Sequence, residues 1–214
     1  MMRSEPRSRV VQRRGYRVGM SRRRFRGAIA GVGTTSGVRV VVGRWDQSPY
    51  GAFVDVMVET ASGHRVLLAP TDEVAEFVAS TYTFDEVRIE PIALNDWTLG
   101  SASLALELTL GGRTALGRLL RLVPGRLAES PAWCTVTDPV ARVALRGVRT
   151  RGTAGNGRRE WYGATDVREV VAMAGAFDGA DLGSLTPVDP PPRFGFSSTP
   201  KRPSVTAVVT TVSG

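Results

Sequence analysis

The sequence predicts a β-rich α+β fold: a mostly antiparallel sheet or partly closed barrel with two to four short helices. Residues 38–42 are nearly all valine, whose branched Cβ suits a pleated sheet. At residues 53–59 three valines alternate with other residues, which is typical of a strand with one apolar face. Ala61-Ser62-Gly63 supplies turn chemistry, so we expect a hairpin over residues 53–68.

A glycine-rich stretch at residues 31–37 precedes the valine run. It has the look of a phosphate-binding loop, but it lacks the G-x-G-x-x-G spacing and the lysine of a P-loop. A strand follows it where a phosphate loop would open a helix. We therefore expect a tight turn between two strands here.

Helices are predicted where capping residues precede an apolar stripe. Thr71 is placed to cap a helix that carries Asp72 and Glu73 in its first turn, where acidic residues are favourable. Weaker helical patterns cover residues 114–122, 138–145 and 166–174.

Further strands are expected at residues 84–92 and 102–110, the second ended by Gly111-Gly112. The prolines between residues 187 and 203 predict an extended course. Residues 205–212, rich in Val and Thr, predict a strand that returns to the sheet.

The net charge of +8 is concentrated at the N-terminus. Residues 1–26 carry ten arginines and one acidic residue, whereas the remaining residues carry 18 basic and 19 acidic residues. The sequence therefore predicts a disordered basic tail at residues 1–26 and a nearly neutral globular domain at residues 27–214.

Three interpretations of the tail are open. Translation starts at Met20, or the tail is a basic arm attracted to nucleic acid or anionic lipid, or Ser21-Arg22-Arg23-Arg24-Phe25 is a twin-arginine export signal. We take the cytoplasm as the default location. No apolar run reaches the roughly 18 residues that a membrane-spanning helix needs.

The scarcity of histidine, cysteine and lysine limits the kinds of catalytic and metal sites that the chain could form. One histidine (His64) and one cysteine (Cys134) fit no zinc spacing and form no internal disulfide, and no cofactor motif is present. Only Lys201 and the N-terminus could form a Schiff base. His64 is either a general base or a solvated residue at a hairpin end. No metal and no cofactor are predicted, and whether the protein is an enzyme stays open.

Two segments mix arginine, glycine and aromatic residues, at residues 149–162 and 193–202. Glycine lets backbone N–H groups converge, and guanidinium groups bind carboxylate or phosphate in a bidentate manner, so the first segment predicts an anion-binding loop. The alternative is a surface loop whose arginines pair with nearby acids. If the segments converge, Trp45, Tyr50 and Phe53 would form an apolar wall. The residues assigned to this candidate site are Arg149, Arg151, Asn156, Arg158, Arg159, Trp161, Tyr162, Arg193 and Lys201.

Several short segments of the sequence resemble those of known families. Gly33-Thr34-Thr35-Ser36-Gly37, Ser48-Pro49-Tyr50-Gly51 and the segments at residues 81–87 and 151–163 resemble a family of uncharacterised bacterial proteins over about residues 25–212. That resemblance implies no activity. Ser48-Pro49-Tyr50-Gly51 before an alternating strand is also similar to the acetoacetate decarboxylase-like fold, a β-rich barrel that holds small oxo-acids. The E-x-x-K lysine of those decarboxylases has no counterpart, because Lys201 follows Thr199-Pro200.

The sequence thus favours a domain that binds a small anionic ligand. Two alternatives stand beside it: association with nucleic acid or an anionic surface through the tail, and a non-catalytic interaction protein.

Overall fold

The computed structural model describes residues 22–124, 151–153, 159–195 and 199–213. In chain order its elements are β1 (Arg22–Thr34), β2 (Arg39–Gln47), β3 (Phe53–Glu59), β4 (Arg65–Ala69), α1 (Asp72–Ala79), β5 (Glu86–Ile89), β6 (Ala93–Asn95), β7 (Thr98–Gly100), β8 (Leu104–Arg113), α2 (Ala115–Leu120), β9 (Arg151–Thr153), β10 (Arg159–Phe177), β11 (Ala180–Asp181), β12 (Leu185–Thr186) and β13 (Ser204–Ser213). The predicted helix at residues 138–145 lies outside the described residues.

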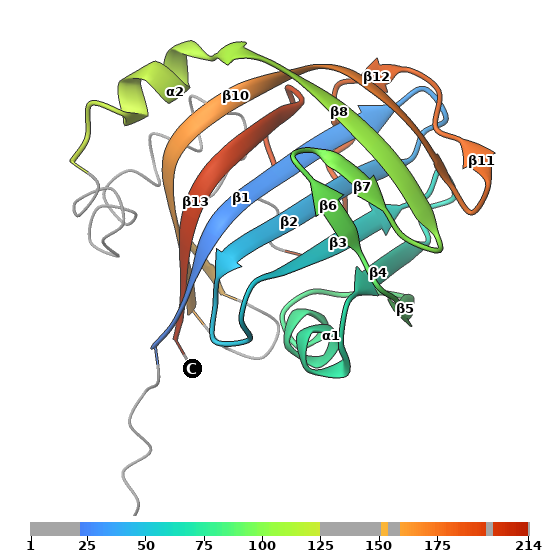
Figure 1. The fold of residues 1–214 in the computed structure, drawn as a ribbon, viewed down its shortest axis with the longest axis horizontal. Coiled ribbons are helices and arrows are strands. Elements are labelled where there is room, and N and C mark those ends of the chain that lie inside the picture. The colour runs from blue at the N-terminus through green and yellow to red at the C-terminus, as the bar shows by residue number, and fades with distance from the viewer. Residues whose placement is uncertain (1–21, 125–150, 154–158, 196–198, 214) are drawn as a thin grey trace, which may run out of the picture.

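One sheet organises the described residues. Its strands follow the order β5-β4-β3-β2-β1-β13-β10-β8-β7-β6, and every ladder is antiparallel except β4 with β5. The sheet curls into an open half-barrel, so that β6, β7 and β8 pass in front of β1, β2 and β3 (Figure 1). The β-rich α+β class predicted from the sequence is confirmed, with two helices among the described residues.

The curl divides the apolar residues of β1–β4 between two cores. We call the face toward β7 and β8 the inner face; it buries Val42, Val56 and Leu68 against leucines of β7 and β8. The opposite, outer face buries Phe25 and Leu67 against α1. Because successive side chains of a strand point to opposite faces, each of these strands contributes to both cores.

The N-terminal half of the chain follows its local signals. Residues 31–34 end β1, and the turn at residues 35–37, in which Gly37 adopts a φ of 82°, joins β1 to β2. The predicted hairpin is β3 with β4. The side-chain oxygen of Thr71 accepts a hydrogen bond from the Val74 amide and caps α1, and Thr114 caps α2 in the same way.

The prediction of a helix at residues 166–174 is wrong. These residues lie in β10, which runs for 19 residues from Arg159 to Phe177 and pairs with both β8 and β13. The spacing of Val167, Val170 and Val171 suits a helix. However, β-bulges near Thr165 and Val171 also change which face successive residues occupy. Pairing with the distant strands β8 and β13 therefore makes these residues a strand rather than a helix. Gly111-Gly112 does not end β8, which continues to Arg113.

β1 begins at Arg22, five residues before the predicted domain boundary. Residues 22–25 of the export-like motif are strand residues, and the Phe25 side chain is buried. At the other end of the chain, β13 lies between β1 and β10, as the Val- and Thr-rich pattern predicted.

The proline-rich segment packs on the outer face of β1. A Cβ at Gly31 would lie only 2.0 Å from Cγ2 of Thr199, so glycine is needed for this close approach. No helix in the described part of the chain has the length and apolarity to cross a membrane.

Candidate functional site

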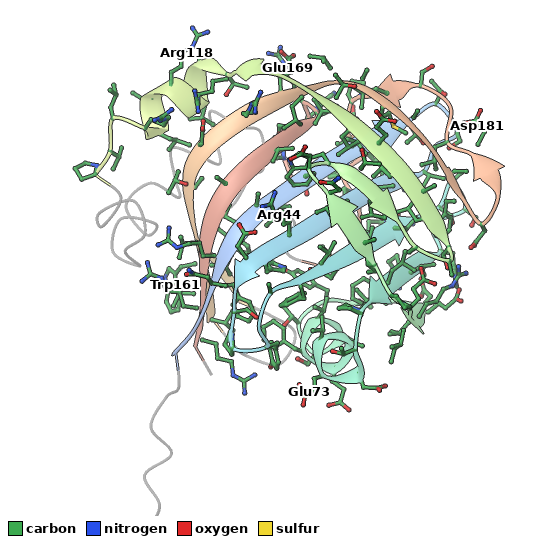
Figure 2. The ribbon with its side chains drawn as sticks, viewed as in Figure 1. Arg44, Glu73, Arg118, Trp161, Glu169 and Asp181 are labelled. Carbon is green, nitrogen blue, oxygen red and sulfur yellow. The ribbon has the colours of Figure 1, made fainter. Side chains whose placement is uncertain are left out.

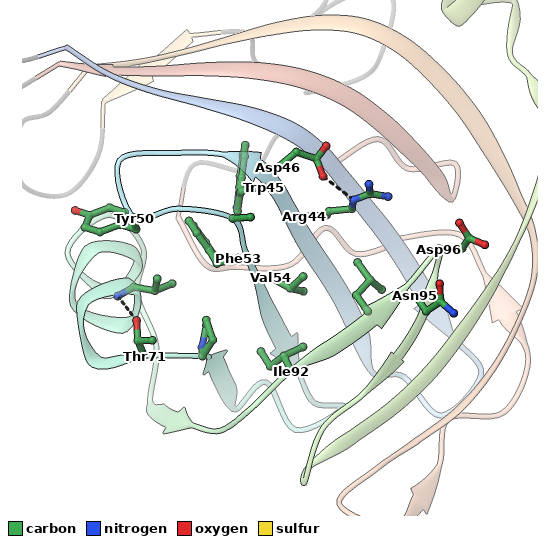
Figure 3. Close-up of a pocket in the computed structure, with 14 residues that line it drawn as sticks. Arg44, Trp45, Asp46, Tyr50, Phe53, Val54, Thr71, Ile92, Asn95 and Asp96 are labelled. Atoms are coloured by element: carbon green, nitrogen blue, oxygen red, sulfur yellow. Dashed lines mark hydrogen bonds and ion pairs between the residues drawn. The ribbon is translucent and has the colours of Figure 1, made fainter.

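A cleft opens at the end of the half-barrel, between the β2–β3 hairpin, the start of α1 and β6 (Figure 3). We call it the end cleft. Its volume is about 630 Å³, within the range of about 300–1,000 Å³ that small-molecule sites occupy. Its lining includes the apolar side chains Phe53, Val54, Ile92 and Leu94, although more of its exposed surface is polar than apolar.

Polar groups stand on the rim of the end cleft. Arg44 and Asp46 form an ion pair with Nε and Oδ1 at 3.0 Å, and both side chains are about half exposed. Asn95 and Asp96 lie at the β6–β7 turn nearby (Figure 3). The charged lining residues in the described structure are Arg44, Asp46 and Asp96, which sum to −1.

A β-bulge places Asp46 at this rim. The β1–β2 ladder pairs Trp45 with Gly27 and Gln47 with Arg26, so Asp46 is the extra residue on its strand. Bulges re-aim side chains and are common beside functional sites. Arg44 and Asp46 lie two positions apart on one strand, a spacing that puts side chains on the same face, and their ion pair keeps them side by side next to the bulge.

A second space lies on the outer face, and we call it the Asp55 cavity. It measures about 50 Å³, enough for one or two waters or a small organic group. Trp45 and Phe53 line both this cavity and the end cleft. Six aromatic side chains form its walls: Phe25, Trp45, Phe53, Phe77, Tyr82 and Tyr162.

Asp55 is the acidic residue of this cavity, and only 4% of its surface is exposed. Its Oδ1 accepts a 2.8 Å hydrogen bond from the indole nitrogen of Trp45. Burial raises the pKa of the Asp55 carboxyl from 3.8 to about 7, although the indole hydrogen bond lowers it in part. A buried acid poised near neutral pH is a common feature of functional sites.

Gly43 makes room for the Asp55–Trp45 pair. It faces Asp55 across the β2–β3 ladder, and a Cβ at this position would lie 2.4 Å from Oδ1 of Asp55 and 2.8 Å from Nε1 of Trp45. The missing side chain lets the indole fold over the strand toward the carboxyl group.

Hydroxyl groups line the opposite side of the cavity. The Tyr82 and Tyr162 hydroxyls form a hydrogen bond with each other. Thr210 lies directly across the β10–β13 ladder from Tyr162. Its buried Oγ1 has no hydrogen-bond partner among the described residues. Buried hydroxyls are normally paired, so this atom stands out.

Comparison with known protein families, characterised proteins and solved structures finds no match to this chain. The resemblances to a bacterial family and to the acetoacetate decarboxylase-like fold therefore stay predictions. In the described residues, no group of three His, Cys, Asp or Glu side chains is arranged to hold a metal ion.

Of the predicted anion-site residues that the structure describes, Arg151, Arg159, Trp161 and Tyr162 lie on the β9–β10 pair of strands, whereas Arg193 and Lys201 lie elsewhere. Arg149, Asn156 and Arg158 lie outside the described residues. Arg151 belongs to β9 and Arg159 to β10, two paired strands where the sequence suggested a loop. Trp161 lies near the ends of β1 and β13, apart from Arg44 (Figure 2).

The remaining predicted residues have other described neighbours. Tyr162 lines the Asp55 cavity together with Trp45 and Phe53. Trp45 and Phe53 are two of the three residues expected to form an apolar wall beside the predicted site. Arg193 binds the buried carboxylate of Glu59, with Nε and Oε1 3.0 Å apart. Lys201 pairs with Asp189, and both side chains are about half exposed.

His64, considered as a general base, lies at the β3–β4 turn with its Nε2 3.1 Å from Oε2 of Glu86. Both side chains are more than a third exposed. Its surroundings are those of a solvated surface pair.

Sequence reasoning did not single out Asp55. The alternation at residues 53–59 directed attention to the valine face and left Phe53, Asp55, Met57 and Glu59 as the polar face. The signal was nevertheless present, because Phe53 and Met57 make that face half apolar. A strand that is apolar on both faces is covered on both.

Proposed function

We propose that this protein binds a small molecule in the end cleft. The ligand would have an apolar body, seated on Phe53, Val54 and Ile92, and an uncharged or positively charged polar group at the rim. The observation that carries the proposal is the cleft itself, which joins a suitable volume to several apolar side chains and a polar rim.

The rim charge supports this choice of ligand. Arg44 is already paired with Asp46, and Asp96 adds a second carboxylate. The net negative charge of the rim would repel an anion. It would attract a cation and would not repel a neutral hydrogen-bonding group. The aromatic walls also favour a cation, because the faces of Trp and Tyr rings attract positive charge.

Three compounds that share a phenyl body test the proposal: 2-phenylethylammonium, 2-phenylethanol and 3-phenylpropionate. A ligand that binds only the native state raises the melting temperature by mass action. We expect the first two to raise it more than the carboxylate does at equal concentration.

Ala52→Trp supplies the matched test, because Ala52 is an exposed lining residue and the indole would fill the cleft. Ala102→Trp is the control, an exposed alanine that does not line the cleft. Loss of the shift in the first variant alone supports the proposal. An equal shift in both variants, or the strongest shift with the carboxylate, contradicts it.

Anion binding at the arginine-rich segment is a separate prediction, because its central residues lie outside the described structure. The cytoplasmic location and the association of the tail with nucleic acid also stay predictions. A variant that begins at Gly27 would lack the Arg22–Arg26 part of β1, so a tail deletion that ends at Ser21 is the sounder test.

A further inference from the structure

The buried carboxylate of Asp55 has no positively charged partner among the described residues of its cavity. Asp55 has one described side-chain hydrogen bond, from Trp45. Among the described residues, no arginine, lysine or histidine lines the cavity. Buried carboxylates are normally paired with a cation or hydrogen-bonded several times, so this one is poorly satisfied within the described structure.

The walls of the cavity suit an organic cation. Six aromatic side chains enclose the space, with Phe25 stacked on Phe77 at 4.9 Å and edge-on to Trp45 at 5.7 Å between ring centroids. Aromatic faces attract alkylammonium groups, and a carboxylate among them adds a full opposite charge. An anion would find no donor of positive charge here.

A second polar residue lines the same space. Thr210 is 4% exposed, and its Oγ1 has no partner in the described structure. Thr210 pairs with Phe25, whereas Asp55 is joined through Gly43 to Ile29, so the two residues lie three strands apart and are offset along the strands. At about 4.8 Å per strand and about 3.3 Å per residue they stand roughly 20 Å apart, so Thr210 lies at the far side of the space and the proposal rests on Asp55.

From these observations we propose that the Asp55 cavity is a binding site for a small alkylammonium compound, with its ammonium group paired to Asp55 and its alkyl group against the aromatic walls. This site is distinct from the end cleft, and it stands or fails independently of the function proposed for that cleft.

The pairing makes affinity depend on pH. Apart from Asp55 itself, the titratable residues of the described lining are Tyr82 and Tyr162, which are hydrogen-bonded to each other. Since the Asp55 carboxyl has a pKa of about 7, it is mostly protonated below pH 7. An ammonium group can pair with it there only if the proton is released, which weakens binding. Affinity should therefore be about 30-fold weaker at pH 5.5 than at pH 8.5.

Methylammonium chloride is the probe, because the cavity of about 50 Å³ holds a compound of about two heavy atoms, and methanol is the uncharged compound of equal size. Binding to the full chain is measured by isothermal titration calorimetry at both pH values and constant ionic strength. We expect methylammonium to bind at least tenfold more tightly than methanol at pH 8.5, with the pH dependence above.

Asp55→Asn keeps the shape of the side chain and removes its charge, so it should abolish the preference for the ammonium compound. Glu107→Gln is the matched control, because it removes an exposed carboxylate that lines neither site and should leave binding unchanged. The titration is repeated in Ala52→Trp protein, in which the end cleft is filled, so ammonium binding that persists there and is lost in Asp55→Asn belongs to the Asp55 cavity.

Three results would overturn the proposal: equal affinity for methanol at pH 8.5, affinity for methylammonium that does not change with pH, or undiminished ammonium binding by folded Asp55→Asn protein. Tighter binding of the alcohol than of the ammonium compound at pH 8.5 would instead assign the cavity to neutral hydrogen-bonding groups.

Discussion

The indole N–H of Trp45 donates a 2.8 Å hydrogen bond to Oδ1 of Asp55 on the neighbouring strand. The two side chains can meet because Gly43, which faces Asp55 across the ladder, has no side chain. The pair joins the end cleft to the Asp55 cavity, since Trp45 lines both. Its energetics can be tested without any ligand.

Asp55 should make the protein less stable as pH rises. Its carboxyl ionises near pH 3.8 in the unfolded chain and near 7 in the native protein, so between these values the native state holds more protons. Stability therefore falls from about pH 4 to pH 7, by at most about 4 kcal/mol. Asp55→Asn should be more stable than the unsubstituted protein at pH 8 and similar to it at pH 4. Urea denaturation at both pH values measures this, and a difference independent of pH would contradict it.

Trp45→Phe should raise the pKa of Asp55 further. The indole hydrogen bond is the side-chain contact that lowers this pKa against the effect of burial, and phenylalanine cannot donate it. A ¹³C NMR titration of the Asp55 carboxyl would show the midpoint move above its value in the unsubstituted protein. Trp97→Phe, which changes a tryptophan packed against the other core, is the control and should leave the midpoint in place.

Gly43→Ala should disrupt the Trp45–Asp55 pair. The added methyl group would lie 2.4 Å from the Asp55 oxygen, so one of the two side chains must move. We expect a loss of about 1–3 kcal/mol, as for other overpacked cores, together with a change in tryptophan fluorescence. Gly100→Ala is the matched control in a strand, because nothing lies within 4 Å of its added Cβ. Equal stability losses in the two variants would show that the close approach is unimportant.

The fold was predictable where local signals decide it, as in the two capped helices, and it was not predictable where distant strands decide it, as at residues 166–174. Thr71 and Thr114 cap helices because a hydroxyl two or three residues before an apolar stripe satisfies free amides, which is a local effect. Residues 166–174 became strand because β8 and β13 flank them, and no property within those nine residues announces such neighbours.

The candidate site was harder to predict for the same reason. Asp96 joins Arg44 and Asp46 at one rim only because the sheet curls, and the sequence context of all three is that of ordinary surface residues. Glu59 shows the opposite effect. In the sequence it is one acid at a strand end, whereas in the structure it is fully buried between Arg39 and Arg193.

Glu59 should be an important stabilising residue. Burial alone would raise its pKa, but hydrogen bonds from Arg193 and the charge of Arg39 outweigh burial and hold the pKa below 4.5. Its contribution to stability is therefore present above pH 4.5 and is lost as the pH falls below that value. Arg39→Met should cost about 3 kcal/mol at pH 7, because Arg39 is only 12% exposed and its loss leaves a buried charge with one partner fewer.

Arg193→Ala is the comparison, and it should cost less, about 1 kcal/mol, because this side chain is 72% exposed and Glu59 keeps Arg39. Denaturation of both variants at pH 7 gives the order of the two losses. The reverse order would show that Arg193 holds the carboxylate and that Arg39 is secondary.

Thr210→Val should preserve or increase stability, which is unusual for a substitution of a buried residue. The Thr210 hydroxyl has no partner among the described residues, so the native state gains nothing from it and loses its hydration. A methyl group of similar size removes that cost, and we expect a change between zero and about 1 kcal/mol in favour of the folded state. Thr34→Val is the matched control: Oγ1 of Thr34 donates a 2.8 Å hydrogen bond to the Val38 carbonyl, so its loss should destabilise the protein by about 1 kcal/mol. Thermal denaturation without added ligand compares the two. A loss of stability in Thr210→Val as large as that in Thr34→Val would mean that the hydroxyl has a partner in solution, such as a bound water.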